Sequence, residues 1–453
     1  MLDLPLAVEF RGEIIEPLLN SVRGGESCSL IGVGSSGKSN LTRHLARLDV
    51  REHYLGQAAR SMLAVYVDCA KLTDYTLRSL HGLILEAVSN AVQESSLETA
   101  TLHRKLESLW EQAAEAAVPD KARRALEEAI ASVLRAGITQ VFVILDDFDH
   151  VVQKAPGPVL NSLRALRDNF KAELVYVIVT RRELAFLRNE NEYQDFHELV
   201  CCETMPIGPY RESDARLMMD RLVLRWGLPP LSEVERQRLW EASGGHAGLL
   251  RAILLTTRHD RQVDLLSPRL IQDLRGHKDV EPECGKIWES LEEEEKRELQ
   301  ALASQSGPLG VAVRPLERKS LIRRRLLDGT FDIFSPVLAD FVRGALPGGR
   351  VTIKLAPEQH QVLVEGRTYD LTSVEYQLFD YLNDLRGRVV SRQKLIKVMI
   401  EAEQTIKTPH VPGNPEHRLD SHMDGIRRKI NVSGEYIIRE PDGRYRLVDA
   451  DGK

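Results

Sequence analysis

The sequence predicts an α/β fold in which a parallel sheet covered by helices is followed by a helical lid and two winged-helix domains at the C-terminal side. Two observations lead to this prediction. In the first third of the chain, short apolar runs rich in β-branched residues alternate with longer segments of helical spacing. Beyond about residue 205, helical segments dominate and are twice closed by a short strand pair. At 453 residues, the chain is long enough for several domains.

Four apolar runs are the expected strands of the parallel sheet. They are Ser27–Ile31, Leu63–Asp68, Val141–Asp146 and Leu174–Thr180. Continuously apolar strands separated by helices are typical of a sheet that is buried on both faces. The sequence therefore predicts a doubly wound arrangement for this part of the chain.

The rest of the chain divides by its local patterns. After Met205-Pro206 only helical segments follow up to about Arg275, which favours a helical lid. Helices closed by a turn at Gly329 then predict a winged helix. Three glycines and a proline between Gly344 and Gly349 predict a linker, because they do not continue a helix. The predicted parts are a core at 1–204, a lid at 205–282, a first winged helix at 283–343, a linker at 344–350 and a second winged helix at 351–453.

Composition excludes several classes of protein. With 43% apolar and 28% charged residues, wholesale disorder, a collagen-like chain and a disulfide scaffold are excluded. The five scattered cysteines favour a reducing compartment, although adjacent Cys201 and Cys202 leave a redox pair as an alternative to a buried strand. No run approaches the ~18 apolar residues of a membrane span. We therefore expect a cytoplasmic protein without a membrane segment.

The run from Gly32 to Ser39 matches the pattern G-x-x-x-x-G-K-[ST] of a phosphate-binding loop. Its glycines let backbone N–H groups point at a phosphate, and the following helix adds its positive N-terminus. Lys38 is expected to reach the β- and γ-phosphates, and the Ser39 hydroxyl is expected to bind Mg²⁺. The predicted nucleotide-binding residues here are Gly32, Gly34, Ser35, Ser36, Gly37, Lys38, Ser39 and Asn40.

Acidic and basic residues follow two of the predicted strands. Asp146 is placed to hold Mg²⁺ through water, and Asp147 is the candidate that polarises an attacking water. Thr180 and Arg181 close the next strand and are expected to sense the γ-phosphate, in preference to Arg182. Two arginines on the preceding helix could reach a neighbouring subunit or lie on a solvated helix face. These are Arg164 and Arg167.

These motifs together resemble a STAND-type or initiator-like member of the AAA+ ATPases. The resemblance rests on the phosphate-binding loop, on Leu145–Asp147, on Val179–Arg181 and on the lid segment Ser243–Arg251. It implies ATP and Mg²⁺ as cofactors, a lid that closes over the nucleotide and a first winged helix that moves with nucleotide state. Many relatives have Glu in place of Asp147, so the resemblance implies slow hydrolysis. It also makes Arg251 a candidate nucleotide-binding second sensor.

Three departures from this resemblance limit what it implies. The segment Phe10–Glu13 reads Phe-Arg-Gly-Glu where the Gly-Arg-Glu order is usual, so an adenine-facing role is not assigned to it. Ala247 stands where the lid motif commonly has proline. The chain carries no repeat array of the kind that senses a ligand in STAND proteins, so we do not expect it to sense a ligand by itself.

The last hundred residues, about Val351–Val448, resemble the OmpR/PhoB-type winged helix-turn-helix. Four blocks carry this resemblance in family order: Asp370–Leu378, Gly387–Leu395, Leu419–Ile430, and the strand pair from Tyr436 to Leu447. The third block corresponds to the recognition helix and the fourth to the wing. The longer loop at 405–415 departs from the family, so polymerase contact is not implied.

Independently of the resemblance, the third predicted helix has the chemistry of a DNA reader. A stripe of Leu419, Met423, Ile426 and Ile430 leaves polar residues to other faces, and a helix fits the major groove. The candidate DNA-binding residues are Arg418, Ser421, His422, Arg428, Lys429, Arg439, Arg444 and Arg446. Residues 351–453 carry 16 basic and 16 acidic side chains, whereas the whole chain has a net charge of −6. A winged helix that docks a protein is the alternative.

The first winged helix has a basic run of its own. It comprises Arg314, Arg318, Lys319, Arg323, Arg324 and Arg325. Phosphate contact and packing against the acidic part of the chain remain two interpretations.

The sequence thus predicts a cytoplasmic switch that binds ATP, hydrolyses it slowly and couples nucleotide state and self-association to binding of double-stranded DNA. Two alternatives remain. One is a transcription regulator that binds nucleotide without hydrolysing it. The other is a subunit of a mobile-element or antiviral-defence assembly whose winged helix docks a partner protein.

Overall fold

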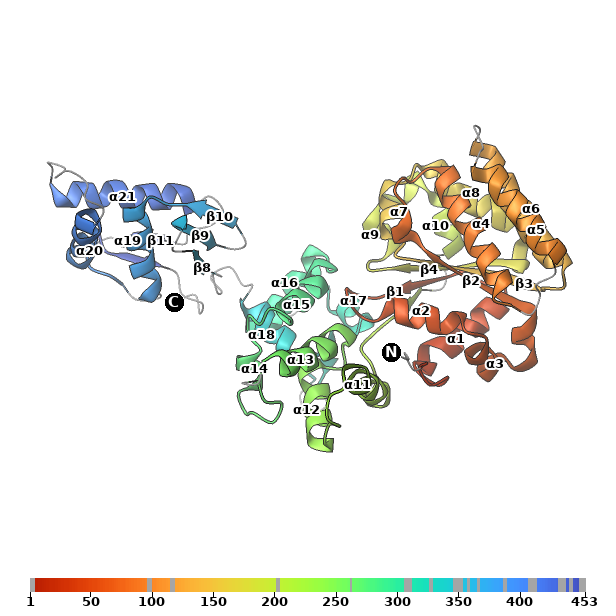
Figure 1. Ribbon diagram of the computed structural model, residues 1–453, viewed down its shortest axis with the longest axis horizontal. Helices are drawn as coiled ribbons and strands as arrows, with labels where there is room; N and C mark the ends of the chain where they lie inside the picture. The colour runs from red at the N-terminus through yellow and green to blue at the C-terminus, as the bar shows by residue number, and fades with distance from the viewer. Residues whose placement is uncertain are drawn as a thin grey trace. The chain divides into compact units, whose positions relative to one another are not determined.

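The computed structural model describes most of the chain (Figure 1). The described residues are 5–95, 100–114, 119–200, 204–260, 263–304, 312–325, 329–344, 353–356, 359–364, 367–385, 389–405, 414–430, 437–439 and 443–447. The chain divides into two compact units, Met1–Ala339 and Asp340–Lys453. Several sequence-based expectations lie outside the described residues: Cys201 and Cys202, most of the linker at 344–350, and most of the loop at 405–415.

A five-stranded parallel sheet forms the centre of the first unit, in the order β2-β3-β4-β1-β5. Its strands are β1 (Cys28–Ile31), β2 (Met62–Asp68), β3 (Gln140–Asp146), β4 (Leu174–Thr180) and β5 (Thr204–Pro206). The predicted α/β fold class is therefore confirmed, and all four predicted strands are present. The sequence did not predict β5, which has only three residues and pairs with β1 at the edge of the sheet.

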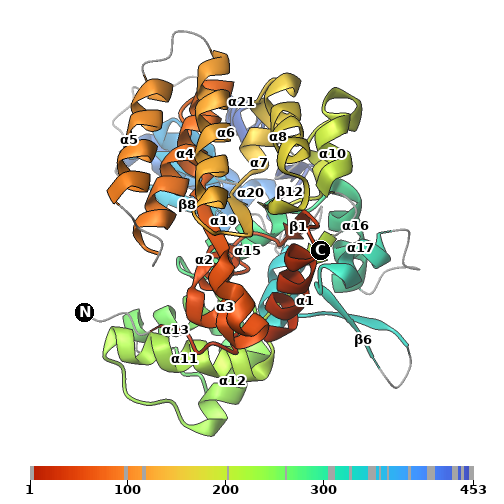
Figure 2. The same ribbon diagram turned by 90° about the vertical axis from the view of Figure 1, so that its right-hand side faces the viewer.

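Both faces of the sheet are buried against helices, because side chains alternate along each strand. In β3, Val143 and Leu145 enter one apolar cluster, whereas Phe142 and Ile144 enter the other. Figures 1 and 2 show α4, α5, α6 and α8 together on one side of the sheet. The helices are α1 (Gly12–Arg23), α2 (Lys38–Ala46), α3 (Leu48–Leu55), α4 (Leu77–Gln93), α5 (Ala100–Ala114), α6 (Pro119–Arg135), α7 (Asp149–Lys154), α8 (Gly157–Phe170), α9 (Leu184–Leu187) and α10 (Gln194–Val200). The 3₁₀ turns are Gly56–Ser61, Cys69–Lys71, Lys171–Glu173 and Glu190–Glu192.

Helices follow β5, and a small antiparallel hairpin follows them. The helices are α11 (Glu212–Trp226), α12 (Glu233–Ser243), α13 (Ala247–His259), α14 (Leu270–Asp273), α15 (Glu281–Glu289), α16 (Glu293–Ser304), α17 (Val313–Arg318) and α18 (Pro336–Gly344). The hairpin pairs β6 (Ile322–Arg324) with β7 (Phe331–Ile333). For clarity, α11–α14 are called the lid, and α15–α17 with the β6–β7 hairpin are called the first winged helix.

The second unit contains a three-stranded antiparallel sheet, three helices and a two-stranded hairpin. The sheet consists of β8 (Ile353–Ala356), β9 (Gln361–Val364) and β10 (Arg367–Asp370). The helices are α19 (Ser373–Asp384), α20 (Arg392–Thr405) and α21 (Pro415–Ile430), and the hairpin pairs β11 (Ile437–Arg439) with β12 (Tyr445–Leu447). A capping box at Thr372 and Glu375 starts α19. The buried stripe of α21 includes Leu419 and Met423, as the spacing predicts.

Among the described residues, no helix is both long enough and apolar enough to cross a membrane.

Candidate nucleotide site

The loop between β1 and α2 brings its lysine to the carboxyl end of the sheet. Gly37 has φ +89°, a left-handed conformation that favours glycine, and α2 begins directly after it. The Lys38 ammonium is buried and donates hydrogen bonds to the carbonyl oxygens of Gly32 at 2.7 Å and Val33 at 3.1 Å. Burial lowers the pKa of Lys38 to about 8, and nearby Asp149 opposes that shift. The cation is thus placed where a phosphate would supply the missing negative charge.

Asp146, at the end of β3, is oriented by three hydrogen bonds. Its Oδ2 accepts from the Tyr66 hydroxyl at 2.9 Å and from the Thr42 hydroxyl at 3.4 Å, and its Oδ1 accepts from the N–H of Asp147 at 3.1 Å. No group of three or more acidic, histidine or cysteine side chains in the described part of the chain could hold a metal. A hydroxyl from Ser39 and one carboxylate instead fit Mg²⁺, which keeps waters and phosphate oxygens as its other ligands.

Asp147 has an unusual backbone conformation at the same edge. Its φ of +51° lies in the left-handed region, where a non-glycine residue is uncommon. Burial first, and then the Asp146 charge, raise the pKa of Asp147. The Arg181 guanidinium lies 3.8 Å from its carboxylate. A half-buried carboxylate with a raised pKa is suited to accept a proton, which agrees with the predicted role of this residue.

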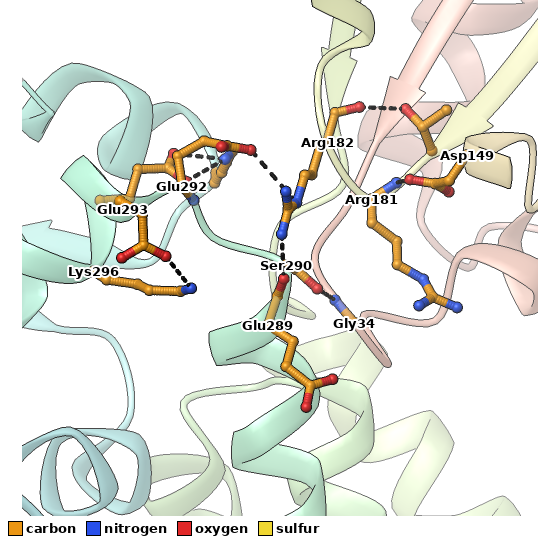
Figure 3. A network of polar contacts seen from close by, with 12 residues as sticks. Gly34, Asp149, Arg181, Arg182, Glu289, Ser290, Glu292, Glu293 and Lys296 are labelled. Carbon is orange, nitrogen blue, oxygen red and sulfur yellow. Dashed lines mark hydrogen bonds and ion pairs between the residues drawn. The ribbon is translucent and has the colours of Figure 1, made fainter. Parts of the chain in front are cut away.

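The end of β4 presents three residues in different directions. The Thr180 hydroxyl is buried and donates to the Arg182 carbonyl at 2.7 Å. The Arg181 N–H donates to Asp149 at 2.9 Å, so this arginine belongs to the acidic cluster beyond β3. The Arg182 side chain instead contacts the first winged helix through the Glu289 carbonyl at 2.6 Å and the Glu292 carboxylate at 3.4 Å. Figure 3 shows these opposite directions.

The lid contacts the phosphate-binding loop through its α13 end. The His246 Nε2 donates to the Gly34 carbonyl at 3.0 Å, while its Nδ1 accepts from the N–H of Leu249 at 3.3 Å. Burial lowers the pKa of His246 to about 4, so the ring is neutral and this tautomer is fixed. The Gly248 N–H donates to the Ser35 carbonyl at 3.0 Å. The lid is therefore fastened to the loop by backbone contacts on two consecutive residues.

The other sequence-predicted residues of this unit have ordinary positions. Arg251 is exposed on α13, and no hydrogen bond or ion pair joins it to the loop within the described ranges, so its role as a second sensor stays a prediction. Asn40 is exposed on α2, and the Ser36 hydroxyl is buried without a hydrogen-bond partner. Arg164 and Arg167 both lie close to Asp168 on α8, which agrees with the solvated-face interpretation.

The basic run of the first winged helix is largely paired within the protein. Lys319 forms a buried ion pair with Glu295, at 2.5 and 2.7 Å to its two oxygens. Arg318 lies 3.4 Å from Glu183 of the α/β part, and Arg323 donates to the Gly244 carbonyl of the lid at 2.8 Å. These contacts favour packing over phosphate binding for this run.

In the second unit, several predicted DNA contacts have acidic partners. Arg418 lies 3.1 Å from Glu403, Lys429 2.7 Å from Glu375, and Arg439 3.5 Å from Asp420, and His422 lies 4.0 Å from Glu403. Ser421, Arg428 and Arg444 are exposed. The side chain of Arg446 lies outside the described residues. The cations of α21 are thus partly neutralised within the unit itself.

Gly425 of α21 has a structural explanation. A Cβ at this position would overlap Oε1 of Glu375, so only glycine allows α19 and α21 to approach this closely. The cost of glycine in a helix is therefore offset by the capping carboxylate that Glu375 supplies to α19 and to Lys429.

Three contributors to the site were not found from the sequence. Tyr66 and Ser290 carry no motif, because only the folded sheet and the first winged helix bring them to Asp146 and Gly34. Asp149 could have been found, since it follows β3 by three residues; it is the carboxylate with the largest effect on the pKa of Lys38.

Comparison with known proteins agrees with this geometry. Residues 22–187 match the AAA domain family, a stretch that includes β1–β4 and the phosphate-binding loop. No protein in the curated set matches the chain. The chain therefore contains an AAA domain.

Among solved structures, the chain is similar to the Walker-type ATPase PABY2304 of Pyrococcus abyssi, with 16% identity, coverage of 74% of this chain and 96% of that one, and a TM-score of 0.46. It is also similar to the ORC2 protein of Aeropyrum pernix in its ADP form, with 13% identity, coverage of 99% and 91%, and a TM-score of 0.36. Domain III of the Thermotoga maritima replication initiation protein DnaA shows 14% identity, coverage of 61% and 95%, and a TM-score of 0.33. At these identities and TM-scores the likeness carries no functional inference.

Proposed function

We propose that this protein is a STAND/AAA+-type switch that binds ATP with Mg²⁺, hydrolyses it slowly, and couples its nucleotide state and self-association to binding of double-stranded DNA by the second unit. One observation carries the nucleotide part of this proposal. The buried Lys38 cation and the carboxylates of Asp146, Asp147 and Asp149 meet at the carboxyl edge of one parallel sheet, as their mutual effects on pKa require. Ligands of open α/β sheets bind at this edge.

Each of these residues has a distinct task in the proposed reaction. Lys38 binds the phosphates, and its ordinary charge returns when a phosphate offsets the burial of the ammonium. Ser39 and Asp146 would hold Mg²⁺, which neutralises developing charge on the phosphates. Asp147 orients a water and accepts its proton, while Arg181 lies close enough to this carboxylate to report the change in charge.

Coupling to the rest of the chain is supported by the contacts of the phosphate-binding loop. His246 of the lid and Ser290 of the first winged helix both hydrogen-bond to Gly34. A change in this loop therefore reaches both elements without an intermediate residue. For the second unit, exposed Arg428 and Arg444 support DNA binding by α21 and the β11–β12 hairpin.

The decisive experiment measures duplex binding by fluorescence anisotropy with ATP, ADP or no nucleotide, at several salt concentrations. We expect ATP to strengthen binding, Lys38→Ala to remove the ATP effect, and Arg428→Ala to weaken binding in every nucleotide state. Lys397→Ala is the matched control, because Lys397 is an exposed cation of α20 that pairs with Glu401. Affinity must fall as salt rises if phosphates are contacted. The coupled switch is refuted if ATP leaves duplex affinity unchanged in the wild-type protein.

A second candidate function has its own supporting observation. Three of the α21 and β11 cations have acidic partners within the unit, and Asp424 is exposed on the same helix. A neutral, mixed-charge helix is suited to docking a partner protein, as in a subunit of a mobile-element or antiviral-defence assembly. Absence of duplex binding, together with a protein that co-purifies only when Arg428 is intact, would favour this candidate.

A further inference from the structure

The turn between α15 and α16 lies directly on the phosphate-binding loop. The Ser290 hydroxyl accepts a hydrogen bond from the Gly34 N–H at 2.8 Å and donates one to the Lys286 carbonyl at 2.7 Å. A Cβ on Gly34 would overlap the Lys286 carbonyl, so the two backbones are in close contact. Ser290 is 3% exposed. One N–H group of the loop is thus taken by the first winged helix.

Arg182 makes a second connection between the same elements. Its guanidinium donates to the Glu289 carbonyl at 2.6 Å, where it meets the C-terminal end of α15, and lies 3.4 Å from the Glu292 carboxylate (Figure 3). A cation at a helix C-terminus interacts favourably with the carbonyl groups there. Since the Arg182 carbonyl also accepts from Thr180, the end of β4 and the turn are joined through one residue. We call Lys286–Glu292 the latch.

The position of Glu283 adds a charge argument. A Cβ on Gly248 would lie 2.5 Å from its Oε2 and 2.6 Å from Cβ of Ser35, so this carboxylate and the loop are both packed against Gly248. The Glu283 Oε2 atom is buried without a hydrogen-bond partner, and its other oxygen accepts from Lys286 at 2.7 Å. A phosphate-binding loop attracts anions, and here a carboxylate of α15 lies beside it. An incoming triphosphate would bring several negative charges toward Glu283 and toward the Glu292 partner of Arg182.

We propose that the latch holds the first winged helix on the phosphate-binding loop, and that a nucleoside triphosphate releases it by competing for Gly34 and Arg182 and by repelling Glu283. This inference rests on the proposed function, since it requires that nucleotide binds at Lys38. Arg182 is a positioning residue in this device, whereas Arg181 faces Asp147. A diphosphate, which lacks the γ-phosphate charge, releases the latch less.

The test uses the full-length protein and two readouts. Hydrogen–deuterium exchange of peptides covering 281–292 reports the latch, and titration with fluorescent ATP and ADP reports affinity. In the wild-type protein, ATP is expected to raise exchange in 281–292 more than ADP does. Ser290→Ala and Arg182→Ala are expected to raise exchange without nucleotide and to tighten ATP binding about fivefold, the fold-change that one hydrogen bond of about 1 kcal/mol represents.

Lys296→Ala serves as the control, because Lys296 lies on α16 and pairs with Glu293 without reaching the loop. It should leave both exchange and affinity unchanged. Ser290→Ala removes a single hydroxyl, so a fold-wide loss of protection is not expected; Arg182→Ala tests the same latch from the sheet side.

Unchanged exchange and ATP affinity in both latch variants would overturn the proposal, as would protection of 281–292 by ATP. Failure of the underlying function looks different: the wild-type protein then binds no nucleotide, or binds it equally well as Lys38→Ala. Lys38-dependent binding with inert latch variants would therefore eliminate the latch alone.

Discussion

Replacing Lys38 by methionine should make the first compact unit more stable at neutral pH and less stable at high pH. The ammonium is 6% exposed, and its pKa is lowered from 10.5 to about 8, first of all by burial. At 1.36 kcal/mol for each tenfold change in an equilibrium constant, the buried charge costs about 3 kcal/mol at pH 7. Methionine removes this charge while keeping a flexible chain of similar length.

Two hydrogen bonds are lost in exchange. The carbonyls of Gly32 and Val33 accept from the ammonium, and their loss destabilises the variant by about 1–2 kcal/mol in total. The expected net effect at pH 7 is a gain of about 1–2 kcal/mol in the free energy of unfolding. Above pH 10.5 the wild-type lysine is neutral in both the folded and the unfolded chain, so only the loss remains.

The sign of the pH dependence follows from linkage. Between pH 8 and 10.5 the unfolded chain holds a proton on Lys38 that the folded chain has released, so wild-type stability rises with pH through this group. The methionine variant lacks this contribution. The difference in stability between the two proteins should therefore shift by about 3 kcal/mol toward the wild type across that window.

Urea unfolding followed by tryptophan fluorescence measures this difference. All four tryptophans, Trp110, Trp226, Trp240 and Trp288, belong to the first unit, so the signal reports that unit. Measurements at pH 7, 8.5 and 10 should show the advantage of Lys38→Met shrinking and then reversing. A difference that stays constant with pH, or a variant that is less stable at pH 7, would refute the burial argument.

Three further outcomes are expected. Asp147→Asn should lower ATP turnover by about 100-fold or more with little change in ATP affinity, and because the pKa of Asp147 is raised, wild-type turnover should fall as pH drops through that pKa; equal turnover in an initial-rate phosphate assay would contradict its role. Tyr66→Phe removes one hydrogen bond to Asp146, so the Mg²⁺ concentration for half-maximal turnover should rise about fivefold, and an unchanged requirement would argue against Asp146 as the metal residue. Gly425→Ala should destabilise the second unit by about 1–3 kcal/mol, seen as faster hydrogen exchange of α19 and α21, although helix propensity alone would give a gain of about 1 kcal/mol.

The sheet could be predicted because its strands are buried on both faces. Such strands must be continuously apolar, so β1–β4 are visible as runs such as Val141–Leu145. The same signal fails for β5, whose three residues are only partly buried and lie at the sheet edge. Pattern length, rather than strand chemistry, separates the two cases.

The site shows a similar division. Residues within one motif have fixed spacing, so Lys38, Ser39 and the pair Asp146–Asp147 are readable from the sequence. Tyr66 and Ser290 are single polar residues whose contacts depend on strand order and on the packing of α15. The sequence also favoured Arg181 over Arg182 without distinguishing their partners, because the direction of each side chain after β4 is a tertiary property.

The charges of the second unit constrain how it would bind DNA. Arg418, Lys429 and Arg439 each lie near a carboxylate, so contact with phosphate exchanges one partner for another and gains less than the binding of an unpaired cation. Exposed Arg428 and Arg444 are then the principal contributors within one copy, and two cations release few counterions. Linking several copies through the ATP-bound first unit raises the effective concentration at DNA without any new contact. The salt dependence of binding separates these contributions: its slope should stay small for a single copy and grow with ATP-driven assembly, in proportion to the number of copies that engage the duplex.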